Sequence, residues 1–70
     1  MYSNLKTALR QKGILNKQYA EFLGISEKTA KNKLNGITDF TYREFKKTCV
    51  LLSEYNADYL FAEDYSRNTA

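Results

Sequence analysis

Histidine is absent from this 70-residue chain, and cysteine occurs once, at Cys49. A single cysteine cannot form an internal disulfide, and without histidine the chain lacks the ligand set of a structural zinc site. No nucleophile and base stand at a recognisable catalytic spacing, and no loop is suited to cradling phosphates. We therefore expect no enzymatic activity, no metal and no cofactor, and we interpret Cys49 as a small core residue.

Long apolar runs are also missing, since no segment approaches the roughly 20 apolar residues that cross a bilayer. The first six residues lack the charged and then apolar order of a signal peptide. These absences predict a cytoplasmic protein without a membrane partner. The length predicts a single small domain over residues 1–65, followed by a flexible tail of residues 66–70.

Charge is distributed unevenly along the chain. Residues 1–36 hold seven Lys or Arg against two acidic residues, a net charge of +5, whereas residues 37–70 hold four against six, a net charge of −2. A surplus of lysines is common on small soluble domains, so this asymmetry alone decides little. Because it coincides with the motif described next, it favours an approach of the first half to nucleic-acid phosphates.

Glycine is scarce, and two of the three glycines, Gly24 and Gly36, lie in the most informative segment, residues 16–36. Ala20 is a small residue where two helices could cross closely, and Gly24, four residues later, tolerates the positive φ of a tight turn. Ile25 can anchor that turn, and Ser26 can cap the helix that follows it. This order of residues predicts a helix-turn-helix.

The rest of the chain also favours helices, because no useful segment alternates with period two. We expect helices over residues 3–12, 16–23 and 26–35, a fourth from about residue 42 and a short fifth from residue 56 or 57. Thr41 and Glu44 have the spacing of a capping box at the start of the fourth. Its expected inner face is Phe45, Cys49 and Leu52, with Val50 and Leu51 beside them. The sequence thus predicts a compact all-α domain of five helices.

The expected helix over residues 26–35 has one apolar and one polar side. Ala30 and Leu34 share the side that should face the core. Lys28 and Asn32, one turn apart, lie on the opposite side. A lysine can donate to guanine O6 and N7, and an asparagine can pair with adenine N6 and N7 in the major groove. We therefore predict that this side reads DNA bases.

Other polar residues of this region have weaker assignments. Glu27 could accept from cytosine N4, or it could simply complement the macrodipole of its helix, and the two interpretations are equally supported. Asn16, at the start of a helix, has backbone N–H groups and a side-chain amide suited to a phosphate. The predicted phosphate-facing residues are Asn16, Lys17, Lys31, Lys33 and Asn35.

Residues 5–64 resemble the Cro and lambda-repressor-like helix-turn-helix domains, which have five helices. The resemblance rests on Leu9-Arg10 with Gly13, on residues 20–26, on Asn35-Gly36 and on residues 59–61. Within that family, residues 24–29 and 32–36 look most like small proteins of temperate-phage lysogeny switches. The resemblance implies a transcriptional regulator that binds operator DNA. It also implies that Glu27, Lys28, Thr29 and Asn32 face bases, while Asn16 and Asn35 face phosphates.

A second function is also open, namely an antirepressor that binds a phage repressor protein and alters its DNA binding. Ten aromatic residues are many for so small a core. Tyr42, Arg43 and Tyr59 have the chemistry of interface anchors, although for any single tyrosine a half-buried aromatic shell is the slightly favoured interpretation. Thr48 stands where the family usually has an aliphatic residue, which suggests a core completed by a partner. A homodimer on a palindromic operator remains a further possibility.

Overall fold

The structure is a computed structural model, and it describes residues 1–64. Five α-helices follow one another, with no strand among these residues. They are α1 (Ser3–Gln11), α2 (Asn16–Leu23), α3 (Glu27–Leu34), α4 (Tyr42–Leu51) and α5 (Ala57–Leu60). The predicted all-α fold of five helices is confirmed. The predicted domain end at residue 65 and the predicted tail of residues 66–70 lie outside the described residues.

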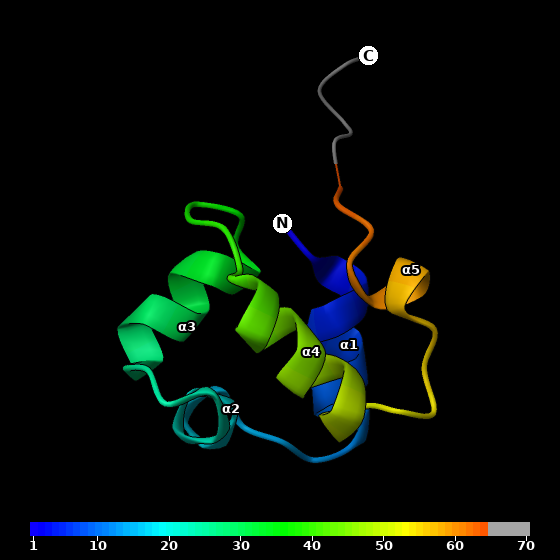
Figure 1. Cartoon of the computed structure of the whole chain (residues 1–70), viewed down its shortest axis with the longest axis horizontal. Helices are drawn as coiled ribbons and strands as arrows, with labels where there is room; N and C mark the ends of the chain where they lie inside the picture. Colours follow the sequence, from blue (N-terminus) through cyan, green and yellow to red (C-terminus); the bar gives the residue numbers. More distant parts are fainter. Residues whose placement is uncertain (65–70) are drawn as a thin grey trace.

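The five helices surround one apolar core (Figure 1). In that arrangement α2 packs against α3 and α4, while α1 packs against α3 and α5. Leucines of α1 and α5 therefore meet although more than 40 residues separate them in the chain, and each fully buried leucine contributes roughly 1.5–3 kcal/mol. The core consists of Leu5, Ala8, Leu9, Tyr19, Leu23, Leu34, Leu52 and Leu60.

A tight turn joins α2 to α3. Gly24 has φ 78° and ψ 30°, a left-handed conformation that glycine adopts without steric cost. The Ile25 N–H donates to the Ala20 carbonyl at 3.0 Å, which satisfies one of the last carbonyls of α2. Ser26 Oγ accepts from the Thr29 N–H at 3.0 Å and so caps α3. The turn and the cap thus lie at the residues predicted for them, and they fix the direction in which α3 leaves α2.

The inner face of α4 differs from the predicted one. The capping box is present, since Thr41 Oγ1 accepts from the Glu44 N–H and Glu44 Oε1 accepts from the Thr41 N–H. However, Glu44, Thr48 and Leu52 are the buried residues of this segment, and Val50 is 74% exposed. Leu52 is buried as predicted, but the rest of the predicted inner face was wrong, since Phe45 and Cys49 are only half-buried. Glu44 and Thr48 take the inner positions instead, because both find buried polar partners.

Thr48 has such a partner in Tyr19. The two hydroxyl oxygens lie 2.6 Å apart in the core, and both side chains are fully buried. Thr48 Oγ1 donates to the Glu44 carbonyl at 2.8 Å, so the Tyr19 hydroxyl donates to Thr48. Every polar atom of this pair is therefore satisfied, and a threonine completes the core where an aliphatic residue was expected.

The Tyr19 hydroxyl should make folding sensitive to alkaline pH. Burial raises the pKa of Tyr19 to about 12, despite the opposing hydrogen bond with Thr48. An unfolded tyrosine titrates near pH 10, so the stabilisation is complete below about pH 10 and is lost as the pH rises from about 10 to about 12. We expect the free energy of unfolding to fall by about 2 kcal/mol across this window, as measured by urea denaturation.

The variant Tyr19→Phe, which has no phenol to ionise, should lose most of this alkaline decline. Tyr59→Phe is the matched control, because it removes a phenol that is 41% exposed and lies outside the core. An equally steep decline in Tyr19→Phe and in the unaltered chain would show that Tyr19 is not its source.

Candidate nucleic-acid interface

One side of α3 fixes the helix against the rest of the molecule. Ala30 is fully buried and Leu34 is 1% exposed, so this side has the contacts of a core helix. Beyond the helix, the Ile37 N–H donates to the Asn32 carbonyl at 2.9 Å, and Gly36 adopts φ 82°. A Cβ atom at Gly36 would lie 3.0 Å from the Met1 nitrogen, so the chain start is packed against this end of α3.

Lys28 and Asn32 lie on the opposite side of α3, one turn apart. Lys28 is exposed and Asn32 is half-buried. Neither side chain forms a hydrogen bond or an ion pair with another of residues 1–64. The structure thus places an unengaged ammonium and an unengaged amide on the outer surface of a helix whose other side is fixed.

The neighbouring base-facing candidates are already engaged. The Glu27 carboxylate lies 3.7 Å from Lys31 Nζ in an ion pair between exposed side chains one turn apart. Ser26 Oγ donates to the Thr29 hydroxyl at 2.9 Å, within the cap of α3. Glu27 also lies in the first turn of α3, where its charge complements the macrodipole. Lys28 and Asn32 are therefore the stronger candidates for reading a ligand.

Lys33 is not available to a phosphate. Its side chain is 90% buried, its Nζ lies 2.9 Å from Glu44 Oε1, and it also donates to the Asp39 carbonyl at 2.8 Å. Burial acts to raise the pKa of Glu44, but the hydrogen bond from Thr41 and the Lys33 ammonium hold that pKa below its ordinary value. The phosphate-facing assignment of Lys33 was wrong, because the residue joins α3 to α4.

Two cations of α1 join the predicted phosphate-facing residues, and the sequence reasoning missed both. Lys6 and Arg10 lie one turn apart on α1, and Lys6 Nζ donates to Asn35 Oδ1 at 2.6 Å, next to the end of α3. The amide nitrogen of Asn35 remains free to donate outward. The spacing of Lys6 and Arg10 indicates that these two cations share one side of α1. Only the packing of α1 against α3 shows that they lie near the end of α3.

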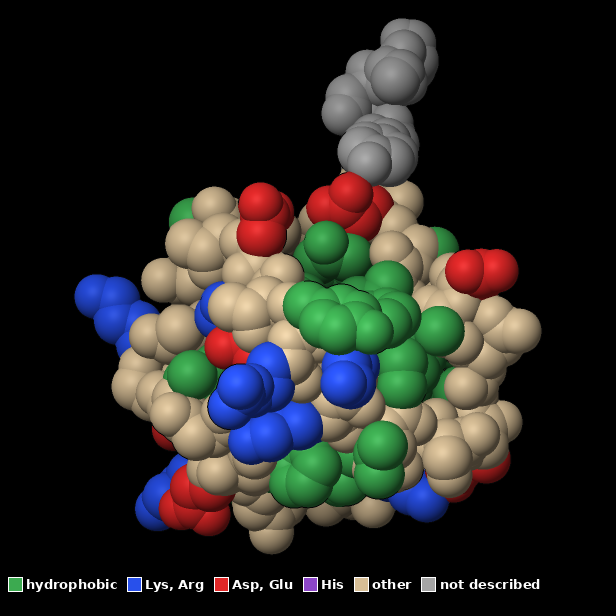
Figure 2. All heavy atoms as spheres, viewed as in Figure 1, with side chains coloured by type: hydrophobic (Ala, Val, Ile, Leu, Met, Phe, Trp, Pro, Cys, Tyr) green, Lys and Arg blue, Asp and Glu red, His purple; other side chains and the backbone are tan. Residues whose placement is uncertain are grey.

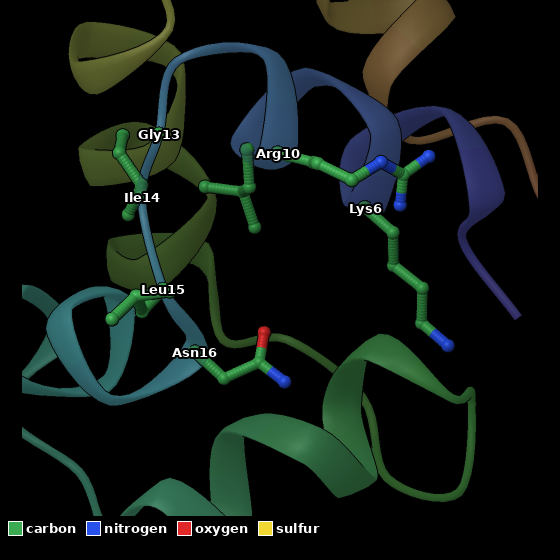
Figure 3. Close-up of a pocket in the computed structure, with 7 residues that line it drawn as sticks. Lys6, Arg10, Gly13, Ile14, Leu15 and Asn16 are labelled. Atoms are coloured by element: carbon green, nitrogen blue, oxygen red, sulfur yellow. The ribbon is translucent and has the colours of Figure 1, made fainter.

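Lys6 and Arg10 line an open pocket of about 390 Å³ together with Leu9 and residues 13–16. Figure 3 shows the Asn16 amide pointing into the space between α1 and α3, with Lys6 extending into the same space from α1. Leu15 precedes α2 and has no side-chain acceptor for the first N–H groups of that helix. Exposed Lys17 follows directly. The pocket therefore combines cations with free N–H donors, which suits an anion.

The three predicted interface residues do not form one surface. Tyr42 and Arg43 begin α4, whereas Tyr59 belongs to α5, which Figure 1 places apart from that end of α4. Tyr59 stacks on Tyr55 with ring centroids 6.1 Å apart, and the adjacent Tyr55 hydroxyl donates to Gln11.

Comparison of the chain with protein-family models, with curated proteins and with solved structures finds no match to any of them. Within residues 1–64, no helix combines the length and the apolar character needed to cross a membrane. No three His, Cys, Asp or Glu side chains gather into a possible metal site in the same part of the chain. The chemistry of these surfaces is therefore the guide to function.

Proposed function

We propose that the chain is a sequence-specific regulator that binds double-stranded DNA with α3 in the major groove. The observation that supports this most is the pairing of a fixed inner side of α3 with the unengaged Lys28 and Asn32 on its outer side. Lys28 would donate to guanine O6 and N7, and Asn32 would make the bidentate pairing with adenine. Thr29 and Glu27 would lie beside these contacts, and their side chains would rearrange to accommodate the bases.

The DNA backbone would be held by residues around α3. One stretch of DNA phosphates would be contacted by Asn16, Lys17 and the pocket cations Lys6 and Arg10. Further phosphate contacts would come from Lys31 and Asn35. Such contacts position the protein without reading sequence, and they make binding depend on salt. Because Asn35 is held by Lys6, its amide group is oriented before DNA arrives, which lowers the entropic cost of the contact.

This chemistry and the resemblance to lysogeny-switch proteins lead us to propose an operator-binding regulator of a phage-type switch, acting on DNA in the host cytoplasm. A homodimer on a palindrome would place the two α3 helices about one helical turn of DNA apart. Selection from a duplex library with a randomised core tests the proposal. Recovery of one recurring motif with adenine and guanine at adjacent contact positions supports it, whereas recovery of unrelated sequences contradicts it.

The pocket cations should determine part of the salt dependence. We expect Lys6→Gln and Arg10→Gln each to weaken binding to every duplex and to reduce the slope of log K against log salt by about one unit, because each removes a phosphate contact. The measurement is fluorescence anisotropy on a selected and a shuffled duplex at several salt concentrations.

Lys12→Gln is the matched control for these variants. Lys12 directly follows α1 and carries the same charge, but its ammonium is paired with Glu54. We expect its slope to stay near that of the unaltered chain. An equal reduction in all three variants would indicate a general effect of net charge and would remove the pocket from the interface.

A further inference from the structure

The outward side of α4 carries apolar groups that the core does not use. We call the residues Tyr42, Phe45, Lys46, Cys49 and Val50 the α4 surface. Tyr42 and Val50 are each 74% exposed, although both are large and apolar. In Figure 2, which faces α4, an aromatic ring lies open on the surface with Lys and Arg side chains beside it. Large exposed apolar groups in one patch indicate an interaction site.

The aromatic end of this surface is held in place from below. Phe45 stacks under Tyr42 with ring centroids 6.4 Å apart, and its ring lies 4.9 Å from that of Phe61. Phe61 in turn meets Phe40 edge to face at 5.3 Å. Lys46 Nζ lies 5.1 Å from the centre of the Tyr42 ring. Tyr42 is therefore an ordered anchor, and docking on it would cost little side-chain entropy.

The exposed charged side chains of α4 are all positive. Arg43, Lys46 and Lys47 are all exposed, and neither Arg43 nor Lys47 forms an ion pair with another of residues 1–64. Glu44 is the only acidic residue in α4, and it points inward to Lys33. The α4 surface therefore presents apolar anchors flanked by cations, with no exposed carboxylate of its own helix to neutralise them.

We infer that the α4 surface docks an acidic amphipathic segment of a partner protein. Tyr42 and Val50 lie about 12 Å apart along the helix at 1.5 Å per residue. A partner helix of about three turns could place two apolar residues on them and its carboxylates against Arg43, Lys46 and Lys47. A second copy of this chain is disfavoured, because its α4 would bring cations against cations. This inference is independent of the proposed DNA contacts, which involve α1, α2 and α3.

The test uses the full chain and a synthetic helical peptide of about 14 residues, with leucine and phenylalanine on one face and glutamate on the other. A scrambled peptide of the same composition is the control. We expect the amphipathic peptide to shift the backbone amide resonances of α4 in ¹⁵N-labelled protein and to bind at least roughly tenfold more tightly than the scrambled one. Equal binding of both peptides, or shifts confined to α1 and α3, would overturn the inference.

Matched variants distinguish docking of the peptide on the α4 surface from a general attraction between the acidic peptide and the basic residues of the chain. Tyr42→Ser and Lys46→Glu should each weaken peptide binding roughly tenfold, while leaving the circular-dichroism spectrum unchanged. Lys28→Glu makes the same change of charge on α3 and should weaken peptide binding by less than about threefold. An equal loss in Lys28→Glu would overturn the inference. It would also be overturned if duplex DNA shifted the α4 amides instead, or if sedimentation showed a dimer that Tyr42→Ser abolished.

Discussion

Lys28→Ala and Asn32→Ala are each expected to reduce the preference of the chain for its selected DNA site by roughly 1–3 kcal/mol. The reason is that each side chain would donate to base edges, and the shortened residue leaves those edges unpaired. Both residues are on the outer side of α3, away from the buried Ala30 and Leu34, so the fold should be unaffected. Competition titrations with the selected duplex and single-base variants measure the effect.

The controls for this prediction lie on the same helix and at its end. Lys31→Ala and Asn35→Ala should weaken binding to all duplexes by similar factors, and Lys31→Ala should also flatten the salt dependence. If Lys28→Ala and Asn32→Ala instead weakened selected and shuffled DNA equally, these two residues would be phosphate contacts and the base-reading assignment would fail.

Lys33→Met is expected to lower the free energy of unfolding by about 2–3 kcal/mol. The change leaves the Glu44 carboxylate without its cation at a site where it is 90% buried, and it also removes the donor to the Asp39 carbonyl. For a domain of this size, that is a large part of the total stability. The midpoint of urea denaturation, at unchanged m value, measures it.

A double-mutant cycle with Glu44→Gln isolates the pair. Glutamine keeps an oxygen that can accept from the Thr41 N–H, so the capping of α4 is retained while the charge is removed. We expect the double variant to be more stable than the sum of the single losses predicts, by about 1–2 kcal/mol. Additive losses would contradict a coupled pair. An altered salt slope of DNA binding in Lys33→Met would restore its phosphate-facing role.

Local signals were enough to predict the helices and the turn. Gly24 and Ser26 act through their own backbone and the nearest turn of helix, and Thr41 with Glu44 does the same at α4. Such interactions span three or four residues, so they can be predicted from a single sequence. The same locality makes the pairing of Lys28 and Asn32 on one side of α3 predictable.

The errors concern residues whose partners are distant in the chain. Thr48 is buried because Tyr19, 29 residues earlier, supplies a hydroxyl at 2.6 Å. Lys33 turns inward because the capping residue Glu44 lies beside it. Neither partner is visible in hydrophobic periodicity, which places polar residues outside by default. Lys6 beside Asn35 is a third case, since it requires the packing of α1 against α3.

One titration tests most directly whether the outer side of α3 reads DNA sequence. The full chain is titrated into its selected duplex and into a shuffled duplex of the same composition, at about 0.05 M and about 0.2 M salt. We predict binding to the selected duplex that is at least roughly a thousandfold tighter, and weaker binding to both at the higher salt. Equal affinity for the two duplexes at both salt concentrations would contradict sequence reading by α3.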